Sequence, residues 1–562
     1  MENLINKTFE RLQSYDIKER ISGNNKQNLF VDNLFKYDTT TENGALSHST
    51  TDDLIVDDFS NAGSYRDRDI EDVFETMFEL WEVDPDNALK SIFYLRLITR
   101  KVKGGFFETE NLQKGQGNKD ESIKRMLWLA YYQPKVFYKN LWLIPLVGSW
   151  KDLFTLMTID FEGRIDRNKI FELIKKGLAD EYNIDLVKKY LPAVKSNSKI
   201  KTNRGILLNS VAKQLATYLF SDEVSSGQIK KTYRKFKSSG KAHTFQQKIS
   251  NGLYEDIDFN LIPGKALNLM VNSNFLSNHN LEDEFIKWLD SKENINYNGY
   301  IYELTRNITK NNDYNKSLNI IQRHTINKQY QSLIDKVKKD TKCGDIKGNV
   351  LCALDTSGSM MTSINKSGVS AFDVCIGLGI YFSDLNQGYF HNIVAMFDNT
   401  SSIKKLNGDF VTKYNSIVND NIAWGSTNFL SVIDLLVDMR KKQPNIPLED
   451  YPDTILVISD MQFNDTNRCN TNHEEAIRRL EEVGLTGIKF IWWDVTSFER
   501  KDYPSKYNDM NTFFFSGFDG SIINELLGFE IQTTPEGKIR EIDMTEIVQK
   551  VYNQDILKQL KL

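Results

Sequence analysis

The chain has 562 residues, of which 40% are hydrophobic and 12% aromatic, and its formal net charge is −5. This composition is typical of a folded protein, and the length indicates two or three domains rather than one core. No run of about 18 apolar residues occurs, so the sequence predicts no transmembrane helix. The N-terminus lacks a basic segment followed by an apolar one, so no secretory signal is expected.

Cysteine and histidine usage indicates the redox compartment. The cysteines, Cys343, Cys352, Cys375 and Cys469, are scattered, and two of them fall in predicted core elements. The six histidines show no metal-ligand spacing. This pattern argues against a disulfide framework and a zinc site and favours a reducing compartment, so we expect a cytoplasmic protein.

The first part of the chain divides into a polar segment and a helical module. Residues 1–65 are polar and expected to be partly disordered, with an acidic, loop-like tract from Asp52 to Asp72. In residues 66–345, apolar residues recur at helical spacing between turn signals such as Asp84–Pro85. The expected helices are Ile70–Trp81, Pro85–Lys101, Lys119–Tyr132, Pro134–Leu141, Trp150–Leu156, Arg167–Leu178, Ile184–Tyr190, Leu207–Phe220 and Leu281–Asp290. Medium helices with short connections favour a HEAT-like repeat of stacked pairs, although no fixed period is found.

One part of the helical module is strongly basic. Residues 188–248 contain 14 Lys and Arg against two acids, a net charge of +12, so the remainder of the chain carries −17. A candidate nucleic-acid contact is the set Lys230, Lys231, Arg234, Lys235 and Lys237, which is interleaved with aromatic residues. Such a stretch could follow a phosphate backbone while an aromatic ring stacks on a base. The alternative is a solvated helix face whose charges maintain solubility.

Residues 346–530 are predicted to form an α/β domain with a doubly wound parallel sheet. Apolar strands alternate with helices, which is typical of a sheet covered on both faces. The expected strands are Val350–Asp355, Asn392–Phe397, Asp453–Asp460, Ile488–Val495 and Thr512–Phe515. The expected helices are Ala371–Leu385, Asn428–Arg440, Asn472–Val483 and Ser521–Leu527. Residues 531–562 are expected to form a tail with a helix that folds back on the body.

Oxygen-bearing side chains follow the strands of this domain. The first strand runs into Asp355, Ser357 and Ser359, an Asp-x-Ser-x-Ser motif, and another strand ends at Asp460. Thr427 lies between them in the loop Trp424–Asn428. Ligands of doubly wound sheets bind beyond the carboxyl ends of the strands, so these five residues should meet at one rim. A hard divalent cation such as Mg²⁺ prefers such oxygen ligands. The alternative is that the carboxylates cap helices and the hydroxyls serve turns.

The five residues resemble the metal-ion-dependent adhesion site of von Willebrand factor A domains, and the resemblance covers roughly residues 349–528. It implies that Asp355, Ser357, Ser359, Thr427 and Asp460 hold one magnesium or similar ion. It also implies an open coordination position that accepts a carboxylate from a protein partner.

The helical part carries a second resemblance, to an uncharacterised Ro-like family of the DUF2828 type. Its motifs are Thr41–Ala45, Asp84–Pro85 followed by Leu89–Arg96, Asn140–Pro145 followed by Gly148–Leu153, and Ile262–Ala266. That family combines a TROVE-like helical module with an A-type domain and occurs in plants, fungi and giant viruses. The resemblance implies binding of RNA or a ribonucleoprotein, in the cytoplasm or, for a viral chain, in the virion. The helical part is not basic overall, and no individual RNA-contacting residue can be matched.

Three functional classes follow. The first choice is a non-catalytic, Ro-like scaffold that binds RNA or a ribonucleoprotein. The alternative is a metal-dependent protein-interaction module without RNA. An enzyme is least favoured, because aspartyl phosphatases need a second carboxylate two residues after the nucleophile and Ser357 stands there. The sequence also contains no convincing phosphate loop, nucleophile elbow or histidine-centred triad.

Overall fold

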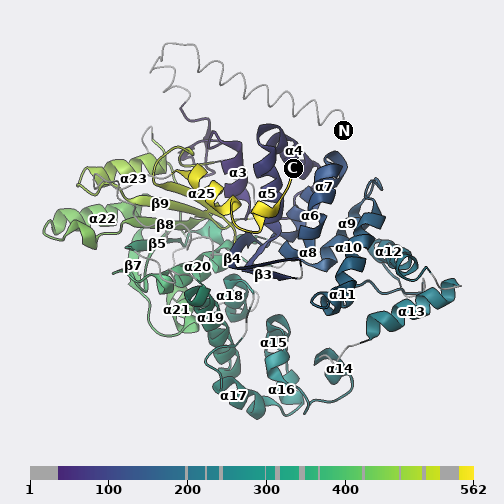
Figure 1. The fold of residues 1–562 in the computed structure, drawn as a ribbon. Coiled ribbons are helices and arrows are strands. Elements are labelled where there is room, and N and C mark those ends of the chain that lie inside the picture. Colours follow the sequence, from purple (N-terminus) through teal and green to yellow (C-terminus); the bar gives the residue numbers. More distant parts are fainter. Residues whose placement is uncertain are drawn as a thin grey trace. The chain divides into compact units, whose positions relative to one another are not determined.

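The computed structural model describes residues 36–104, 106–196, 200–221, 225–239, 245–295, 297, 299–309, 317–340, 348–364, 368–419, 425–466, 470–496, 502–518 and 543–562. The chain forms two compact units (Figure 1). The first, the helical unit, contains residues 67–247 and 550–562, and the second, the sheet unit, contains residues 20–66 and 248–549. Residues 1–19 are also assigned to the helical unit but precede the described range.

The helical unit is built almost entirely from the helices that apolar spacing predicted. In chain order its elements are α4 (Ile70–Val83), α5 (Pro85–Arg96), β3 (Ile98–Gly104), β4 (Phe107–Gln116), α6 (Lys119–Tyr132), α7 (Pro134–Asn140), η1 (Leu141–Leu143), α8 (Ile144–Val147), α9 (Trp150–Ile159), α10 (Arg167–Ala179), α11 (Ile184–Tyr190), α12 (Asn203–Leu219) and α13 (Ser226–Ser238). The 3-10 turn η7 (Leu557–Gln559) also belongs to it. Helix α14 (Phe245–Ser250) crosses the boundary between the units.

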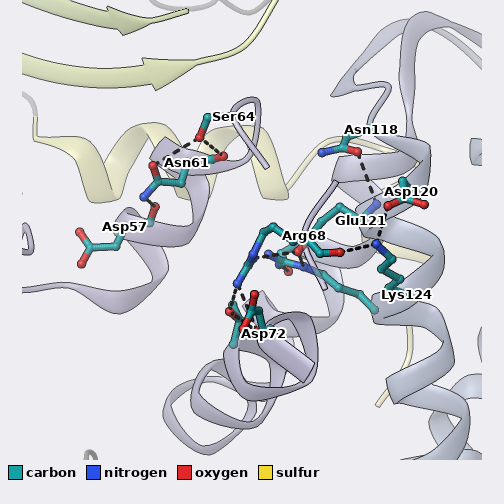
Figure 2. A network of polar contacts seen from close by, with 12 residues as sticks. Asp57, Asn61, Ser64, Arg68, Asp72, Asn118, Asp120, Glu121 and Lys124 are labelled. Atoms are coloured by element: carbon teal, nitrogen blue, oxygen red, sulfur yellow. Dashed lines mark hydrogen bonds and ion pairs between the residues drawn. The ribbon is translucent and has the colours of Figure 1, made fainter. Parts of the chain in front are cut away.

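Buried ion pairs join the first helices of this unit. Figure 2 shows Arg68, just ahead of α4, with its guanidinium 3.1 Å from the Glu121 carboxylate on α6. Glu121 also accepts from Arg125 one turn later, at 2.9 Å, and both side chains are almost completely buried. Lys124 binds Asp120 at 2.6 Å and donates to the main-chain oxygen of Arg68. Because each buried charge has a partner, these contacts fix how α4 and α6 pack.

Sequence spacing did not predict the hairpin β3–β4. The predicted helix Pro85–Lys101 ends at Arg96, and an antiparallel pair follows in which Ile98 is opposite Gln116 and Gly104 is opposite Phe107. The C-terminal residues of the chain bind this hairpin. The side chain of Gln554 accepts from the Lys114 amide at 2.6 Å and donates to the Lys114 carbonyl at 2.8 Å. The tail thus folds back on the body, as expected.

The sheet unit contains a six-stranded sheet among helices. Its elements are β1 (Thr39–Thr40), β2 (Leu46–Ser47), α3 (Leu54–Asn61), η3 (Phe259–Leu261), α15 (Gly264–Val271), α16 (Phe275–Asn278), α17 (Glu282–Asp290), α18 (Ile301–Thr309), α19 (Ile320–Asp340), β5 (Val350–Asp355), η4 (Gly358–Met361), α20 (Ala371–Leu385), β6 (Ile393–Phe397), β7 (Ser401–Lys405), α21 (Phe410–Val418), α22 (Leu430–Lys442), η5 (Leu448–Asp450), β8 (Thr454–Ser459), α23 (Asn472–Glu481), β9 (Lys489–Asp494) and β10 (Thr512–Ser516). Helix α25 (Met544–Tyr552) crosses into the helical unit. The predicted helix Ser521–Leu527 lies outside the described residues.

The strand order of the large sheet is β10-β9-β8-β5-β6-β7. Every residue of the central strands β5 and β8 is buried, which explains their uninterrupted apolar sequences. Figure 1 shows α20 and α21 on one face of this sheet and α22 and α23 on the other. The expectation of a wholly parallel sheet is wrong, because β7 pairs antiparallel with β6. This short strand alternates polar residues at an exposed edge, so it lacks the apolar run by which the others were predicted.

The expected helical module, residues 66–345, is divided between the two units, because its last helices pack against the sheet domain. The hydroxyl of Thr305 on α18 donates to the main-chain oxygen of Asp373 on α20 at 3.1 Å. On α19, the Tyr330 ring stacks on Phe410 at 4.1 Å, and its hydroxyl donates to Asp384 at 2.7 Å. These contacts make residues 248–340 part of the unit that contains the candidate site.

Residues 36–66 also belong to the sheet unit. Strands β1 and β2 form a small antiparallel ladder, with Thr39 opposite Ser47. The loop expected from Asp52 to Asp72 is wrong over Leu54–Asn61, where helix α3 forms because the Asp53 carboxylate accepts from two amides of its first turn. Residues 1–35, the rest of the expected polar segment, lie outside the described residues.

Candidate metal centre

The candidate site lies where the doubly wound sheet changes direction. Numbered by chain order within the sheet, the strands follow the doubly wound order 3-2-1-4-5-6, and β5 and β8 are its first and fourth strands. The chain leaves these neighbouring parallel strands toward opposite faces, which opens a crevice at their carboxyl ends. Asp355 is the last residue of β5, and Asp460 follows the last residue of β8. The two carboxylates therefore flank the crevice.

Asp355 is completely buried and held by the two strands beside it. Its Oδ1 accepts from the Ser357 amide at 2.9 Å, and its Oδ2 accepts from the hydroxyl of Ser459 at the end of β8. Burial raises the pKa of Asp355 to about 7, and the nearby charge of Asp460 adds to the rise, whereas the two serines oppose it. Two carboxylates held this close, away from water, form a site that a cation would stabilise.

Asp460 is also buried, with 8% of its surface exposed. Burial raises its pKa, and the Ser359 hydroxyl and the Gln462 amide, which donate hydrogen bonds to it, act in the opposite direction. The Gln462 amide lies 3.1 Å from Oδ1. The charges of Asp494, at the end of β9, and of Glu42 raise the pKa of Asp460 further. The loop after β8 therefore lies in a locally negative field.

The hydroxyls complete the rim. Ser357 is buried, Ser359 is exposed, and their Oγ atoms lie 3.1 Å apart. Thr427 is buried, and its amide and carbonyl bind the Asn464 side chain and amide at 3.2 and 3.0 Å. The structure thus brings Asp355, Ser357, Ser359 and Asp460 into one hydrogen-bonded cluster and ties the Thr427 loop to the loop after Asp460. Trp424, the predicted start of the Thr427 loop, lies outside the described residues.

The donor set fits a hard divalent cation better than zinc. Across the described ranges, no group of three or more His, Cys, Asp and Glu side chains is arranged to hold a metal ion. A cation here would thus need hydroxyl or water ligands beside the two carboxylates, which suits Mg²⁺. Two carboxylates only balance the charge of a dication. Such an ion would remain able to accept another anionic ligand.

Residues that the sequence motif did not identify position the ligands. Ser459 binds the Asp355 carboxylate, and Asn464 joins the second and third loops through Thr427 and through the Ser426 hydroxyl at 2.9 Å. Ser459 could have been found from its place at the carboxyl end of a predicted strand. Asn464 could not, because its role depends on how the loop after β8 turns back toward Thr427.

The candidate nucleic-acid residues lie on α13 of the helical unit. Tyr233 is completely buried and donates to the Pro192 carbonyl at 2.8 Å, and the Phe236 ring packs 5.7 Å from that of Phe220. The exposed or half-exposed cations are Lys230, Lys231, Arg234, Lys235 and Lys237. At about 100° per residue they occupy the side of the helix opposite Tyr233. Tyr233 cannot stack on a base, because it belongs to the core.

Within the described part of the chain, no helix combines the length and apolar character needed to cross a bilayer. Fold and site define a two-unit protein, one unit mainly helical and the other a mixed six-stranded α/β sheet with acidic and hydroxyl residues at its rim. The two buried cysteines of the sheet unit, Cys352 and Cys375, are free thiols, as expected for core positions.

Comparisons with known proteins match both parts of the chain to families without an assigned function. Residues 41–262 match the family described as Domain of unknown function (DUF2828), which confirms that part of the expected resemblance. Residues 349–559 match Domain of unknown function (DUF7788). An uncharacterised protein of Acanthamoeba polyphaga mimivirus is 25% identical over 516 residues, which cover 87% of this chain and 84% of that protein. The chain is thus similar along most of its length to a protein of a giant virus.

Proposed function

We propose that this chain is a non-catalytic binding scaffold whose sheet unit holds one magnesium-type cation. The observation that carries the proposal is the hydrogen-bonded cluster of Asp355, Ser357, Ser359 and Asp460 at the switch point of the sheet. The doubly wound order and the position of these residues support a von Willebrand A-type domain, and the helices before it support a TROVE-like module. The proposed place of action is the cytoplasm, or the virion for a viral chain.

The proposed role of the cation is to bind a carboxylate from a protein partner. The Asp355 and Asp460 carboxylates are buried, whereas Ser359 is exposed, so the side of the site beside Ser359 faces solvent. An ion whose charge the two aspartates only balance would keep its attraction for a third carboxylate. No catalytic nucleophile is proposed, because both carboxylates are assigned to the cation.

An array of short peptides, each with one Asp or Glu, tests this role. Full-length protein should bind a subset of peptides in Mg²⁺, lose them in chelator and regain them when Mg²⁺ is restored. The same peptides with Asn or Gln in place of the acid are the matched controls. Binding that survives chelator, or an Asp355→Ala variant that binds as well as wild type, would refute the cation-bridged mode.

A second proposed function is binding of RNA through the helical unit. The observation that favours it is the basic face of α13, where Lys231, Arg234 and Lys235 are exposed on the side away from Tyr233. Contact would be with phosphates, because the Tyr233 ring is buried and the Phe236 ring is packed beside Phe220. Purification with and without nuclease, followed by sequencing of bound RNA, tests whether the chain binds RNA at all.

A further inference from the structure

The turn Thr41–Ala45 binds the loop that carries Asp460. The hydroxyl of Thr41 donates to the Phe463 carbonyl at 2.7 Å, and the Glu42 amide donates to the Gln462 side chain at 2.7 Å. The Asn43 side chain donates to the Gln462 carbonyl at 2.5 Å. Contacts thus reach the loop from three consecutive residues of a segment more than 400 positions away in sequence.

The turn is built to present these groups. The Thr41 amide donates to the Ala45 carbonyl at 2.9 Å, and the Ala45 amide donates to the Thr41 hydroxyl at 3.0 Å, so the same hydroxyl closes the turn and holds the loop. Gly44 has a φ of +86°, a left-handed conformation that favours glycine, and it forms an isolated bridge with Asn464. The turn is therefore preformed, and little ordering entropy opposes its contact with the loop.

The contacts of the turn lead directly to the candidate ligands. Gln462, which binds Glu42 and Asn43, donates its own amide to the Asp460 carboxylate at 3.1 Å. Asn464, which bridges to Gly44, holds both main-chain polar groups of Thr427. Movement of the turn would thus be transmitted to the second and third loops of the site together.

Glu42 places an additional negative charge beside this loop. Its side chain is exposed, while its main chain lies against Gln462, two residues from Asp460. In the part of the chain that the structure describes, three carboxylates do not converge as metal ligands, so Glu42 is not a direct ligand. Its charge nonetheless reaches Asp460, whose pKa it raises. A negative charge several Å from a dication attracts it through space, even in a high effective dielectric.

We infer that the turn Thr41–Ala45 is a fourth loop of the cation site, which holds the Asp460 loop in place and strengthens cation binding through the charge of Glu42. This inference rests on the proposed function, because it assumes that the site takes a cation. It also gives a physical role to the first motif of the DUF2828 match, which begins at residue 41 but lies in the same unit as the site.

The charge of Glu42 is tested by titrating full-length wild type, Glu42→Gln and Glu449→Gln with Mn²⁺ and with Mg²⁺. Glu449 is equally exposed and precedes β8, at the opposite end of that strand from Asp460, so its variant is the matched control for net charge. Glu42→Gln should weaken binding roughly three- to ten-fold, and the difference should shrink at high salt, because the charge is exposed. Equal affinity of Glu42→Gln and wild type would overturn the role of the charge.

The role of the turn is tested without any ion. The Asp465 amide donates to the Asn43 carbonyl at 3.3 Å, so hydrogen exchange of a peptide covering residues 461–466 reports whether the turn is bound. Thr41→Val preserves side-chain shape but removes the hydroxyl, and it should speed exchange in this peptide and weaken Mn²⁺ binding at all salt concentrations. Unchanged exchange and affinity would overturn the inference. A wild type that binds no ion would instead refute the proposed function, while the exchange result would still decide whether the turn holds the loop.

Discussion

The amide of Gly358 donates to the carbonyl of Gly425 at 3.1 Å, which joins the loop after β5 to the Thr427 loop. Gly425 also lies against Asn399, and a Cβ added there would fall 2.2 Å from the Asn399 Nδ2 atom. Asn399 in turn accepts from the Ser426 amide at 2.9 Å. The candidate site therefore depends on a close approach that only glycine allows at residue 425.

Gly425→Ala should weaken Mg²⁺ binding about ten-fold, a typical loss when groups that orient metal ligands are disturbed. The added methyl group must displace Asn399 or the loop, and Thr427 would move with it. Calorimetric titration measures the effect. Gly227→Ala is the control, since nothing but the Ser225 hydroxyl lies within 4 Å of its Cβ position. An alanine at 425 that binds Mg²⁺ as well as wild type would show that the loop contact is not needed.

The pKa of Asp355 predicts a pH dependence of stability in ion-free protein. Its folded-state pKa of about 7 lies above the model value of 3.8, so the folded state holds a proton that the unfolded state has lost. This group therefore destabilises the fold increasingly as pH rises from about 4 to 7. Between pH 5.5 and 8, Asp355→Asn should gain about 2 kcal/mol in unfolding free energy relative to wild type. Urea unfolding at both pH values measures it, and an equal difference between the proteins at both would contradict the prediction.

Mg²⁺ affinity should rise over the same pH range. Below pH 7 a cation must displace the proton of Asp355, whereas above it the carboxylate is already charged. Titrations at pH 6 and 8 should thus differ by roughly ten-fold in affinity. Identical affinities would mean that Asp355 is not a ligand or is already ionised at pH 6.

The sequence predicted the sheet unit well because its strands and ligands follow local rules. The buried strands β5 and β8 are continuous apolar runs, and Asp355 and Asp460 stand at their carboxyl ends. Strand β7 was missed because it is a short, exposed edge strand without an apolar run. The metal assignment itself, including the roles of Ser357, Ser359 and Thr427, stays a prediction.

Long-range contacts were beyond the reach of sequence patterns. The turn at Thr41 meets the Phe463 carbonyl across more than 400 residues, and no periodicity in either segment indicates this. The Tyr233 ring, interpreted as a possible base-stacking group, is buried because it faces the core side of α13. A single sequence cannot give the facing direction of an isolated basic helix when its apolar residues are few.

The basic face of α13 predicts a salt-dependent contact with RNA. Replacing Lys230, Lys231, Arg234, Lys235 and Lys237 with Gln removes up to five phosphate contacts. For a single strand the salt slope falls by about 0.7 per contact, so a decrease of about 2 to 3.5 is expected. RNA affinity across a salt series measures it. An unchanged slope would mean a solvated face only, and no binding by wild type at low salt would remove the RNA proposal.

Asp152 should be important for the stability of the helical unit. It is completely buried and lies 2.7 Å from the Arg96 guanidinium, 2.8 Å from the Lys119 amine and 2.9 Å from the Ser149 amide. Asp152→Asn leaves buried cations without their counter-charge, so the expected loss is about 3–5 kcal/mol. Asp86→Asn, whose acid pairs with Lys90 at the surface, should cost less than about 1 kcal/mol. Urea unfolding of both variants measures the contrast, and similar losses would contradict it.

The measurement that tests the central claim most directly is calorimetric titration of Mg²⁺ into full-length wild type, Asp355→Asn and Asp460→Asn at pH 8. We predict one binding event per chain in wild type and none in either variant, with the far-ultraviolet circular dichroism of all three proteins unchanged. Equal binding by wild type and both folded variants, or no binding by wild type, would contradict a cation site at the rim of the sheet.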